Sequence, residues 1–417
     1  MPYYWGAILI GGVFLAGCTQ NQETTTTQSG SKENVIKVGL LVDLSGGLAT
    51  YGNNEKHICE IAEEKINKYF EEKGMPYKVK LYVEDTRADP NICLQKVQAL
   101  HAQGITFFLG PMASGEVKNI KGFINSNKIV IISPSSTAPP QMLGFRTPEE
   151  KKYVFRFVPT DNFQGNAIGD VAKQLGLKNV IVIYRKDAWG DGLERATVEK
   201  LKANGINIID EIPYDPNIGD WSPIIQTTTN KIAGKGNDTG VIFIGYEEVA
   251  TLLSQIDDNS PLLKHVWIGC DGTANSKKVL EEAKNKAVKV KLYSTMFQSE
   301  TDEAEKIKEE FKKRGYGEPD QYALNVYDAF WVGAISYAEM LNKTGGKYDA
   351  DLLSKLIKEN TVKYSEGQFG VKSVTGYIKL NEWNDRASGN YGIFAVTEDG
   401  WKLVGVWDST TGKINWK

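Results

Sequence analysis

The sequence is poor in the residues and motifs that most enzymes use for catalysis. It contains three histidines: His57 and His101 fall on predicted helices, and His265 opens a predicted strand. None of the three lies beside a plausible nucleophile in the sequence. The GxSxG, HExxH and P-loop patterns are absent, and GLLVDLSGG lacks the spacing of a dinucleotide-binding GxGxxG turn. We therefore expect neither an enzyme nor a bound cofactor.

Cysteine is also scarce, with 4 in 417 residues. Beyond Cys18 the sequence has only Cys59, Cys93 and Cys270, an odd number without CxxC spacing. This argues against a zinc site and against a disulfide framework. A disulfide between Cys59 and Cys93, both on predicted early helices, is the alternative. We expect buried free thiols and no bound metal.

Charge of one sign does not dominate the sequence. The net charge is -3 and no long basic run is present, so we expect no nucleic-acid partner. A hydrophobic fraction of 41% and a charged fraction of 24% are typical of a soluble globular protein. Since 417 residues exceed the usual size of one domain, two domains are expected.

Long hydrophobic runs are missing after the first residues. YYWGAILIGGVFLAGC is an apolar stretch of about fifteen residues, too short for a comfortable bilayer span, and no later run reaches about eighteen. The stretch ends in Leu15-Ala16-Gly17-Cys18. This ending resembles the lipobox of lipoproteins, in which the signal peptide, here residues 1–18, ends at the cysteine that receives the lipid. A secretory signal cut elsewhere and a short anchor helix are the alternatives.

A polar segment follows Cys18. Residues 19–34 cannot bury a core and are predicted to form a flexible tether. A lipid on Cys18 and a folded body beyond the tether would place that body outside the cytoplasm. We expect it to be anchored to the outer face of the cell membrane.

From residue 35 onward, short apolar runs alternate with amphipathic helical segments such as 55–70 and 91–101. The runs are rich in Val and Ile and almost uninterrupted, which indicates strands buried on both faces and therefore parallel sheets with helices on each side. Two series of such runs predict two doubly wound α/β lobes joined by a hinge. The predicted strands are 36–42, 79–83, 105–109 and 129–132, then 180–184, 206–209, 241–244 and 266–268.

Each predicted lobe is built from two parts of the chain. Lobe 1 takes residues 35–157 and about 297–365, and lobe 2 takes residues 158–296 and about 366–417. Long helices are expected at 300–314 and 325–341. From residue 367 the sequence alternates between apolar and polar residues with turn signals, which predicts short strands and hairpins.

Polar and aromatic side chains follow the predicted strands, and in open parallel sheets ligands bind outside the carboxyl ends of the strands. Hydroxyl groups follow the strands of the first lobe, aromatic residues follow strands of both lobes, and a carboxylate follows a strand of the second lobe. The residues of interest are Tyr51, Ser114, Ser135, Thr137, Trp189, Tyr246 and Asp271. This division matches a small zwitterion.

The two charged groups of a zwitterion would meet different lobes. Ser114 and Thr137 each precede a possible helix start, where hydroxyls and free N–H groups stabilise a carboxylate. Asp271 and the Tyr246 hydroxyl could hold an ammonium group. Each residue also has a plain structural interpretation: Ser114 and Thr137 as helix caps, Tyr246 and Trp189 as packing between lobes, and Asp271 as part of a turn.

Six segments, in this order, carry a family resemblance that runs from about residue 35 to about residue 408. They are VGLLVDLSGGLATYG, FFLGPMASGEV, IISPSSTAP, AWGDGLERA, FIGY and GCDGTAN. The chain resembles the type I periplasmic binding proteins of the leucine/isoleucine/valine-binding family. These are the substrate-binding components of branched-chain and related amino-acid ABC transporters. The resemblance implies a bilobal, Venus-flytrap clamp that closes on its ligand.

The resemblance also implies roles for individual residues. Ser114 and Thr137 match the positions that bind the α-carboxylate, and the Ser135 carbonyl matches an acceptor for the α-amino group. Tyr246 and Asp271 match the residues that hold that amino group from the other lobe. The positions that shape the side-chain pocket of family members match Tyr51, Trp189 and Tyr327.

The chain departs from the best-known members at three positions, one of which is Trp189, bulkier than the tyrosine often found there. Its acidic residue is Asp rather than the longer Glu, and Ala113 stands where a disulfide cysteine would be. The expected function is capture of a free amino acid, apolar, branched-chain or aromatic, and its delivery to the permease subunits of an ABC transporter. The alternative is a sensory or regulatory module of the same fold that recognises an amide, urea or an aromatic acid.

Overall fold

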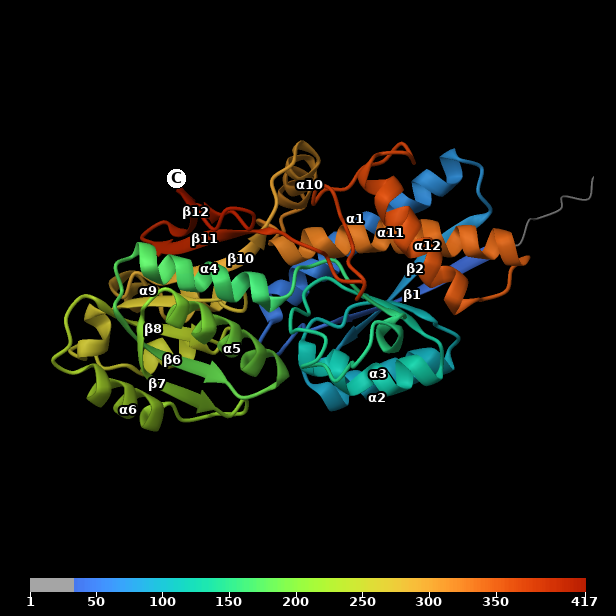
Figure 1. The fold of residues 1–417 in the computed structure, drawn as a ribbon. Coiled ribbons are helices and arrows are strands. Elements are labelled where there is room, and N and C mark those ends of the chain that lie inside the picture. The colour runs from blue at the N-terminus through green and yellow to red at the C-terminus, as the bar shows by residue number, and fades with distance from the viewer. Residues whose placement is uncertain (1–33) are drawn as a thin grey trace, which may run out of the picture. The chain divides into compact units, whose positions relative to one another are not determined.

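Two separate β-sheets organise residues 34–417, the part of the chain that this computed structural model describes (Figure 1). The predicted signal peptide, the predicted lipidation at Cys18 and the predicted tether up to residue 33 lie outside the described residues. None of the helices within residues 34–417 has the length and apolar character needed to cross a membrane.

The first sheet is parallel throughout, with the strand order β2-β1-β3-β4-β5. Helices α1, α11 and α12 lie on one side of it and α2 and α3 on the other (Figure 1). Its strands are β1 (Asn34–Val42), β2 (Tyr77–Asp85), β3 (Phe107–Leu109), β4 (Val130–Ser133) and β5 (Val154–Arg156). Its helices are α1 (Ala49–Glu72), α2 (Pro90–Ala102), α3 (Ser114–Ser126), α11 (Gln321–Thr344) and α12 (Ala350–Ser365).

The second sheet has the order β13-β12-β11-β10-β9-β8-β6-β7. Strands β6 to β10 run parallel, and β11 to β13 complete one edge as antiparallel strands. Its strands are β6 (Asn179–Arg185), β7 (Asn207–Tyr214), β8 (Thr239–Ile244), β9 (Val266–Gly269), β10 (Tyr293–Gln298), β11 (Asn390–Thr397), β12 (Gly400–Trp407) and β13 (Ile414–Trp416).

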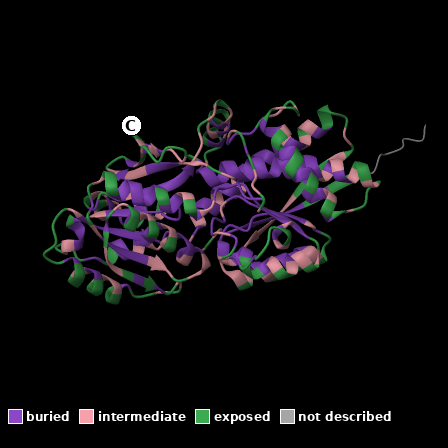
Figure 2. Ribbon diagram, viewed as in Figure 1, coloured by how far each residue is buried: buried purple, intermediate pink, exposed green. Residues whose placement is uncertain are grey.

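The remaining helices lie along the chain between β4 and α11. They are α4 (Asp161–Gln174), α5 (Ala188–Ala203), α6 (Ser222–Ile232), α7 (Val249–Gln255), α8 (Lys277–Glu282), α9 (Lys284–Lys289) and α10 (Asp302–Lys313), with the 3-10 turns η1 (Glu149–Lys151) and η2 (Pro261–Lys264). The predicted fold class, two α/β lobes with parallel sheets, is confirmed. Buried residues occupy both sheets and the helix faces against them (Figure 2).

The chain passes between the two sheets three times: after β5, after β10 and before β11. The predicted lobe boundaries stay a prediction. Residues 373–386, which were assigned to lobe 2, contact elements of the first sheet. The backbone N–H groups of Val374 and Thr375 donate to the Asp328 carboxylate on α11, each at 2.9 Å.

The strand prediction was wrong for residues 367–389, which form turns and irregular chain. Their alternation of apolar and polar residues is real, but Asp328 takes two of the N–H groups that a sheet would need. The hairpin predicted beyond this segment is present as β11 and β12. Strands β5 and β10 were not predicted, because each is short or interrupted by polar residues.

A buried ion pair holds the last crossing segment against the first sheet. The Arg156 guanidinium on β5 donates to both carboxylate oxygens of Asp385 at 2.6 Å, and all three side chains of Arg156, Lys151 and Asp385 are inaccessible to solvent. Burial acts to raise the pKa of Asp385, but the charges of Arg156 and Lys151 hold it below its ordinary value. Asp385 is therefore ionised at neutral pH.

Replacing Asp385 by Ala should lower the free energy of unfolding by about 3–5 kcal/mol, because it leaves the buried Arg156 guanidinium without its counter-charge. Urea unfolding at pH 7 measures the change. Asp399→Ala is the matched control, since that carboxylate is 77% exposed and bonded only to a neighbouring lysine, and it should shift stability by about 0.5 kcal/mol at most. Equal losses for the two variants would contradict the role given to Asp385.

Candidate functional site

A cavity lies where the carboxyl ends of strands from both sheets meet. Its lining includes six of the eight residues that the sequence predicted: Tyr51, Ser114, Ser135, Trp189, Tyr246 and Asp271. Five further residues complete it: Leu48, Met112, Ala113, Gly272 and Tyr322. The strand-end rule thus brought together side chains that are up to 220 residues apart in the sequence.

The first sheet contributes hydroxyl groups and a helix start. Ser114 is the first residue of α3, and its Oγ accepts a hydrogen bond from the backbone N–H of Ala138 at 3.1 Å. The first amides of α3 have no acceptor within the helix, so this end of α3 carries partial positive charge. Thr137 lies just behind the lining, where its Oγ1 accepts from the Trp189 indole N–H at 3.0 Å.

The second sheet contributes carboxyl groups. Oδ1 of Asp271 accepts from the backbone N–H of Gly272 at 3.0 Å, and Oδ2 accepts from the Tyr322 hydroxyl. Burial raises the pKa of Asp271 to about 6, against the opposing effect of the Tyr322 hydrogen bond. The group is ionised at neutral pH but close to its titration range.

A second carboxyl group, Asp161, stands near Asp271 and was not predicted. It is fully buried at the start of α4, and neither of its oxygens has a hydrogen-bond partner within the described chain. Burial raises its pKa well above the ordinary value, and the charge of Asp271 raises it further. The side-chain oxygens of Gln164 and Tyr391 are likewise buried without a partner. The oxygens of Asp161 and Gln164 therefore lack donors, whereas the Tyr391 hydroxyl can itself donate.

The sequence held the signal for Asp161. This residue follows β5 just as the other site residues follow their strands. It was passed over because the sequence predicted only a lobe boundary after residue 157 and no strand there.

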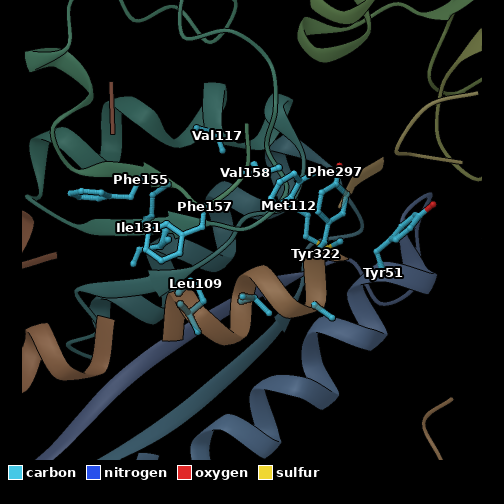
Figure 3. Packing of buried hydrophobic residues seen from close by; sticks show 14 of the residues in the cluster. Tyr51, Leu109, Met112, Val117, Ile131, Phe155, Phe157, Val158, Phe297 and Tyr322 are labelled. Carbon is cyan, nitrogen blue, oxygen red and sulfur yellow. The ribbon is translucent and has the colours of Figure 1, made fainter. Parts of the chain in front are cut away.

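Aromatic rings form the walls of the cavity. The rings of Trp189 and Tyr246 lie 4.8 Å apart between centroids, and those of Tyr51 and Tyr322 lie 6.2 Å apart, edge to face. Figure 3 shows Tyr51 on α1 and Tyr322 at the start of α11, with Met112 beside Tyr322. Such walls suit an apolar or aromatic group.

Tyr327 does not reach this cavity. It lies further along α11, where it packs against Trp331 and lines a separate surface pocket with Tyr69. Tyr322 occupies the cavity wall in the first turn of the same helix. The predicted helix began at residue 325, so its first turn was missed.

The cavity is almost filled by its own side chains. Its free volume is about 20 Å3, whereas one water molecule needs roughly 10–15 Å3 measured in this way. A ligand of amino-acid size thus requires that side chains of the lining rearrange. The three cysteines of the described chain, Cys59, Cys93 and Cys270, are buried and free, as predicted.

Comparison with known proteins agrees with this geometry. A family model described as periplasmic binding protein matches residues 35–400. The chain belongs to this family of periplasmic binding proteins. This membership confirms the resemblance that the sequence segments indicated.

Three similar proteins illustrate the relationship. Leu/Ile/Val-binding protein homolog 3 of Brucella melitensis is 28% identical over 247 residues, which are 58% of this chain and 62% of the relative, so the match spans less than two thirds of that protein. The leucine-, isoleucine-, valine-, threonine- and alanine-binding protein of Pseudomonas aeruginosa is 24% identical, over 81% of this chain and 86% of the relative. The crystal structure of a leucine-binding protein from Thermotoga maritima has a TM-score of 0.72 at 19% identity, covering 89% of this chain and 98% of that one.

Replacing Asp161 by Asn should stabilise the ligand-free protein by about 1–2 kcal/mol at pH 7, because a buried carboxyl group without partners is costly. The pKa of Asp161 is raised in the folded state, so between about pH 4 and that raised pKa the native protein binds more protons than the unfolded chain. The free energy of unfolding therefore decreases as pH rises through this window. In Asp161→Asn this decrease should be absent. Urea unfolding at pH 5 and pH 7 measures both effects.

Asp170→Asn on the same helix is the control. The Asp170 carboxylate pairs with Lys200 at 3.0 Å and accepts from the Trp407 indole N–H at 3.0 Å, so its loss should destabilise the protein. Destabilisation by Asp161→Asn as well would show that Asp161 is satisfied in the folded state.

Proposed function

We propose that this protein is an extracytoplasmic solute-binding protein that captures a free amino acid with an apolar or aromatic side chain and delivers it to an ABC permease. The observation that carries the proposal is the electrical asymmetry of the cavity. The start of α3 and its hydroxyl come from the first sheet, and the buried carboxyl group of Asp271 comes from the second sheet, directly after β9. A zwitterion complements both sides.

The ligand carboxylate is assigned to the first sheet. Ser114 Oγ, Thr137 Oγ1 and the first amides of α3 supply hydrogen-bond donors and partial positive charge there. Thr137 donates to the ligand while it continues to accept from Trp189, since a hydroxyl can do both.

The ligand ammonium is assigned to the second sheet. An ammonium group offers three N–H donors, and the Asp271 carboxylate, the Tyr246 hydroxyl and the Ser135 carbonyl are candidate acceptors for them. Asp161 adds a carboxyl group whose oxygens have no partner within residues 34–417. A cation placed here would relieve a desolvation cost that the protein itself leaves uncompensated.

The ligand side chain is assigned to the space between the aromatic walls. Tyr51, Trp189, Tyr246 and Tyr322 surround it, and they favour apolar or aromatic groups over charged ones. The names of the relatives, which bind leucine, isoleucine and valine among others, support a branched-chain ligand.

Closure of the clamp and its location complete the proposal. Contacts such as the hydrogen bond from the Tyr51 hydroxyl to the Ala274 carbonyl, 2.7 Å, join the two lobes, and a ligand that bridges them favours this arrangement. The protein catalyses no reaction, and the lipid on Cys18 keeps it at the outer face of the membrane beside its permease.

A thermal-shift panel of the twenty free amino acids, with benzoate, urea and an aliphatic amide as comparison ligands, tests the ligand class. An amino acid at 100 times its dissociation constant should add about 2.7 kcal/mol to the stability. Asp271→Asn should abolish the shift for amino acids, and Asp210→Asn, which removes a surface ion pair with Lys231, should preserve it. A shift with benzoate or an amide and with none of the amino acids would refute the proposal.

Binding should also depend on pH through Asp271. Because its pKa is about 6 in the ligand-free protein, protonation below pH 6 removes the charge that holds the ammonium group. The affinity should therefore be constant above about pH 7 and fall as pH decreases through 6. Calorimetric titration with L-leucine between pH 5 and 8 measures this dependence, and an affinity that does not change over this range would exclude Asp271 as the ammonium partner.

A further inference from the structure

The first helix of the chain begins without a cap of its own. The residue before α1 is Leu48, whose side chain makes no capping hydrogen bond, and no acidic residue occurs in the first turn. The first amides of a helix need acceptors from elsewhere. At α1 the acceptor comes from the other lobe.

Glu247 supplies this acceptor from the loop after β8. One of its carboxylate oxygens accepts from the backbone N–H of Thr50 at 3.0 Å, and the other accepts from the Thr50 hydroxyl at 2.6 Å. Thr50 is the second residue of α1, the position that a helix-capping side chain usually contacts. The two residues are 197 positions apart in the sequence.

The same contact also serves a helix start in the second lobe. The Thr50 hydroxyl accepts from the backbone N–H of Lys277, the first residue of α8, at 3.3 Å. Ser276 donates to the Glu247 carboxylate at 2.5 Å. Glu247 is 3% exposed. Its carboxylate therefore receives hydrogen bonds from donors of both lobes in place of water.

The contact adjoins the cavity without belonging to its lining. Thr50 precedes Tyr51, and Glu247 follows Tyr246, and both tyrosines form cavity walls. The bond between Thr50 and Glu247 can form only when α1 and the loop after β8 meet. This meeting also sets the two tyrosines across the ligand space from each other.

We propose that Glu247 is a positioning residue for closure of the clamp. Its carboxylate caps α1 across the cleft and shifts the equilibrium toward the closed form, which raises the apparent affinity for the ligand without touching it. The effect on affinity rests on the proposed function, whereas the effect on closure does not. Closure mediated by Glu247 gives the ligand-free protein a measurable closed population.

Glu247→Gln and Thr50→Val test the proposal, because both substitutions preserve size and Thr50→Val keeps the backbone N–H. Each should raise the dissociation constant for L-leucine, Glu247→Gln by about tenfold. The loss in the double variant should be smaller than the sum of the two single losses, because the hydroxyl bond that Thr50→Val removes is one of the bonds that Glu247→Gln weakens. Strictly additive losses, or a change of less than twofold in Glu247→Gln, would overturn the proposal.

Small-angle X-ray scattering of the ligand-free proteins measures how extended the folded molecule is. A loss of stability that leaves the protein folded does not change this quantity. Glu247→Gln should be more extended than the unmodified protein, and identical scattering curves would overturn the proposal. Absence of leucine binding in the unmodified protein would count against the proposed function instead, and the scattering comparison would still decide the role of Glu247.

Asp349→Ala is the matched control. Asp349 caps α12 within its own lobe, accepting from the backbone N–H of Leu352 at 2.9 Å. Its loss should lower the melting temperature as the loss of any helix cap does, with no change in the dissociation constant or in the scattering curve. An equal rise in the dissociation constant for this variant would show that loss of stability alone explains the effect of Glu247→Gln.

Discussion

The buried pair of Arg156 and Asp385 connects three parts of the chain on which the site depends. Arg156 ends the first sheet, and Asp385 belongs to the last segment that crosses toward the second sheet. The same guanidinium donates to the backbone carbonyls of Ser136 and Ala138 at 3.1 and 2.5 Å. One side chain thus fixes the loop after β4 relative to a crossing between the lobes. The geometry is planar and forked, which a lysine could not reproduce.

That loop is held from other sides as well. Ser133 donates through its hydroxyl to the Pro111 carbonyl at 2.6 Å, and Asn325 on α11 donates to the Pro134 carbonyl at 2.9 Å. The prolines at 134, 139 and 140 remove backbone freedom. The Ser135 carbonyl and the Thr137 hydroxyl therefore occupy fixed positions at the cavity before any ligand arrives, which lowers the entropic cost of binding.

The sequence predicted those parts of the fold and site that depend on local pattern. Long runs of Val and Ile marked most of the parallel strands, and the residues directly after them, such as Ser114 and Asp271, do line the cavity. Short strands were missed: β5 has only three residues, and one of them is an arginine that is buried because Asp385 neutralises it. Asp161 was overlooked for the same reason.

Features that rest on distant partners could not be predicted. Tyr322 rather than Tyr327 reaches the cavity because α11 begins at residue 321, after the capping side chain of Asp320. The apolar alternation after residue 367 forms no sheet because a carboxylate on another helix binds its amides. The cap that Glu247 provides for α1 joins two residues 197 positions apart, and no local sequence pattern links them.

The topology of the two sheets has a consequence for the order in which the chain can fold. The second sheet needs β11 to β13 to cover the edge of β10, and the first sheet needs α11 and α12 to cover one face. All of these elements come after residue 320. A growing chain would therefore carry a first sheet with one uncovered face and an incomplete second sheet until its last quarter had emerged, and both lobes must finish folding at nearly the same time.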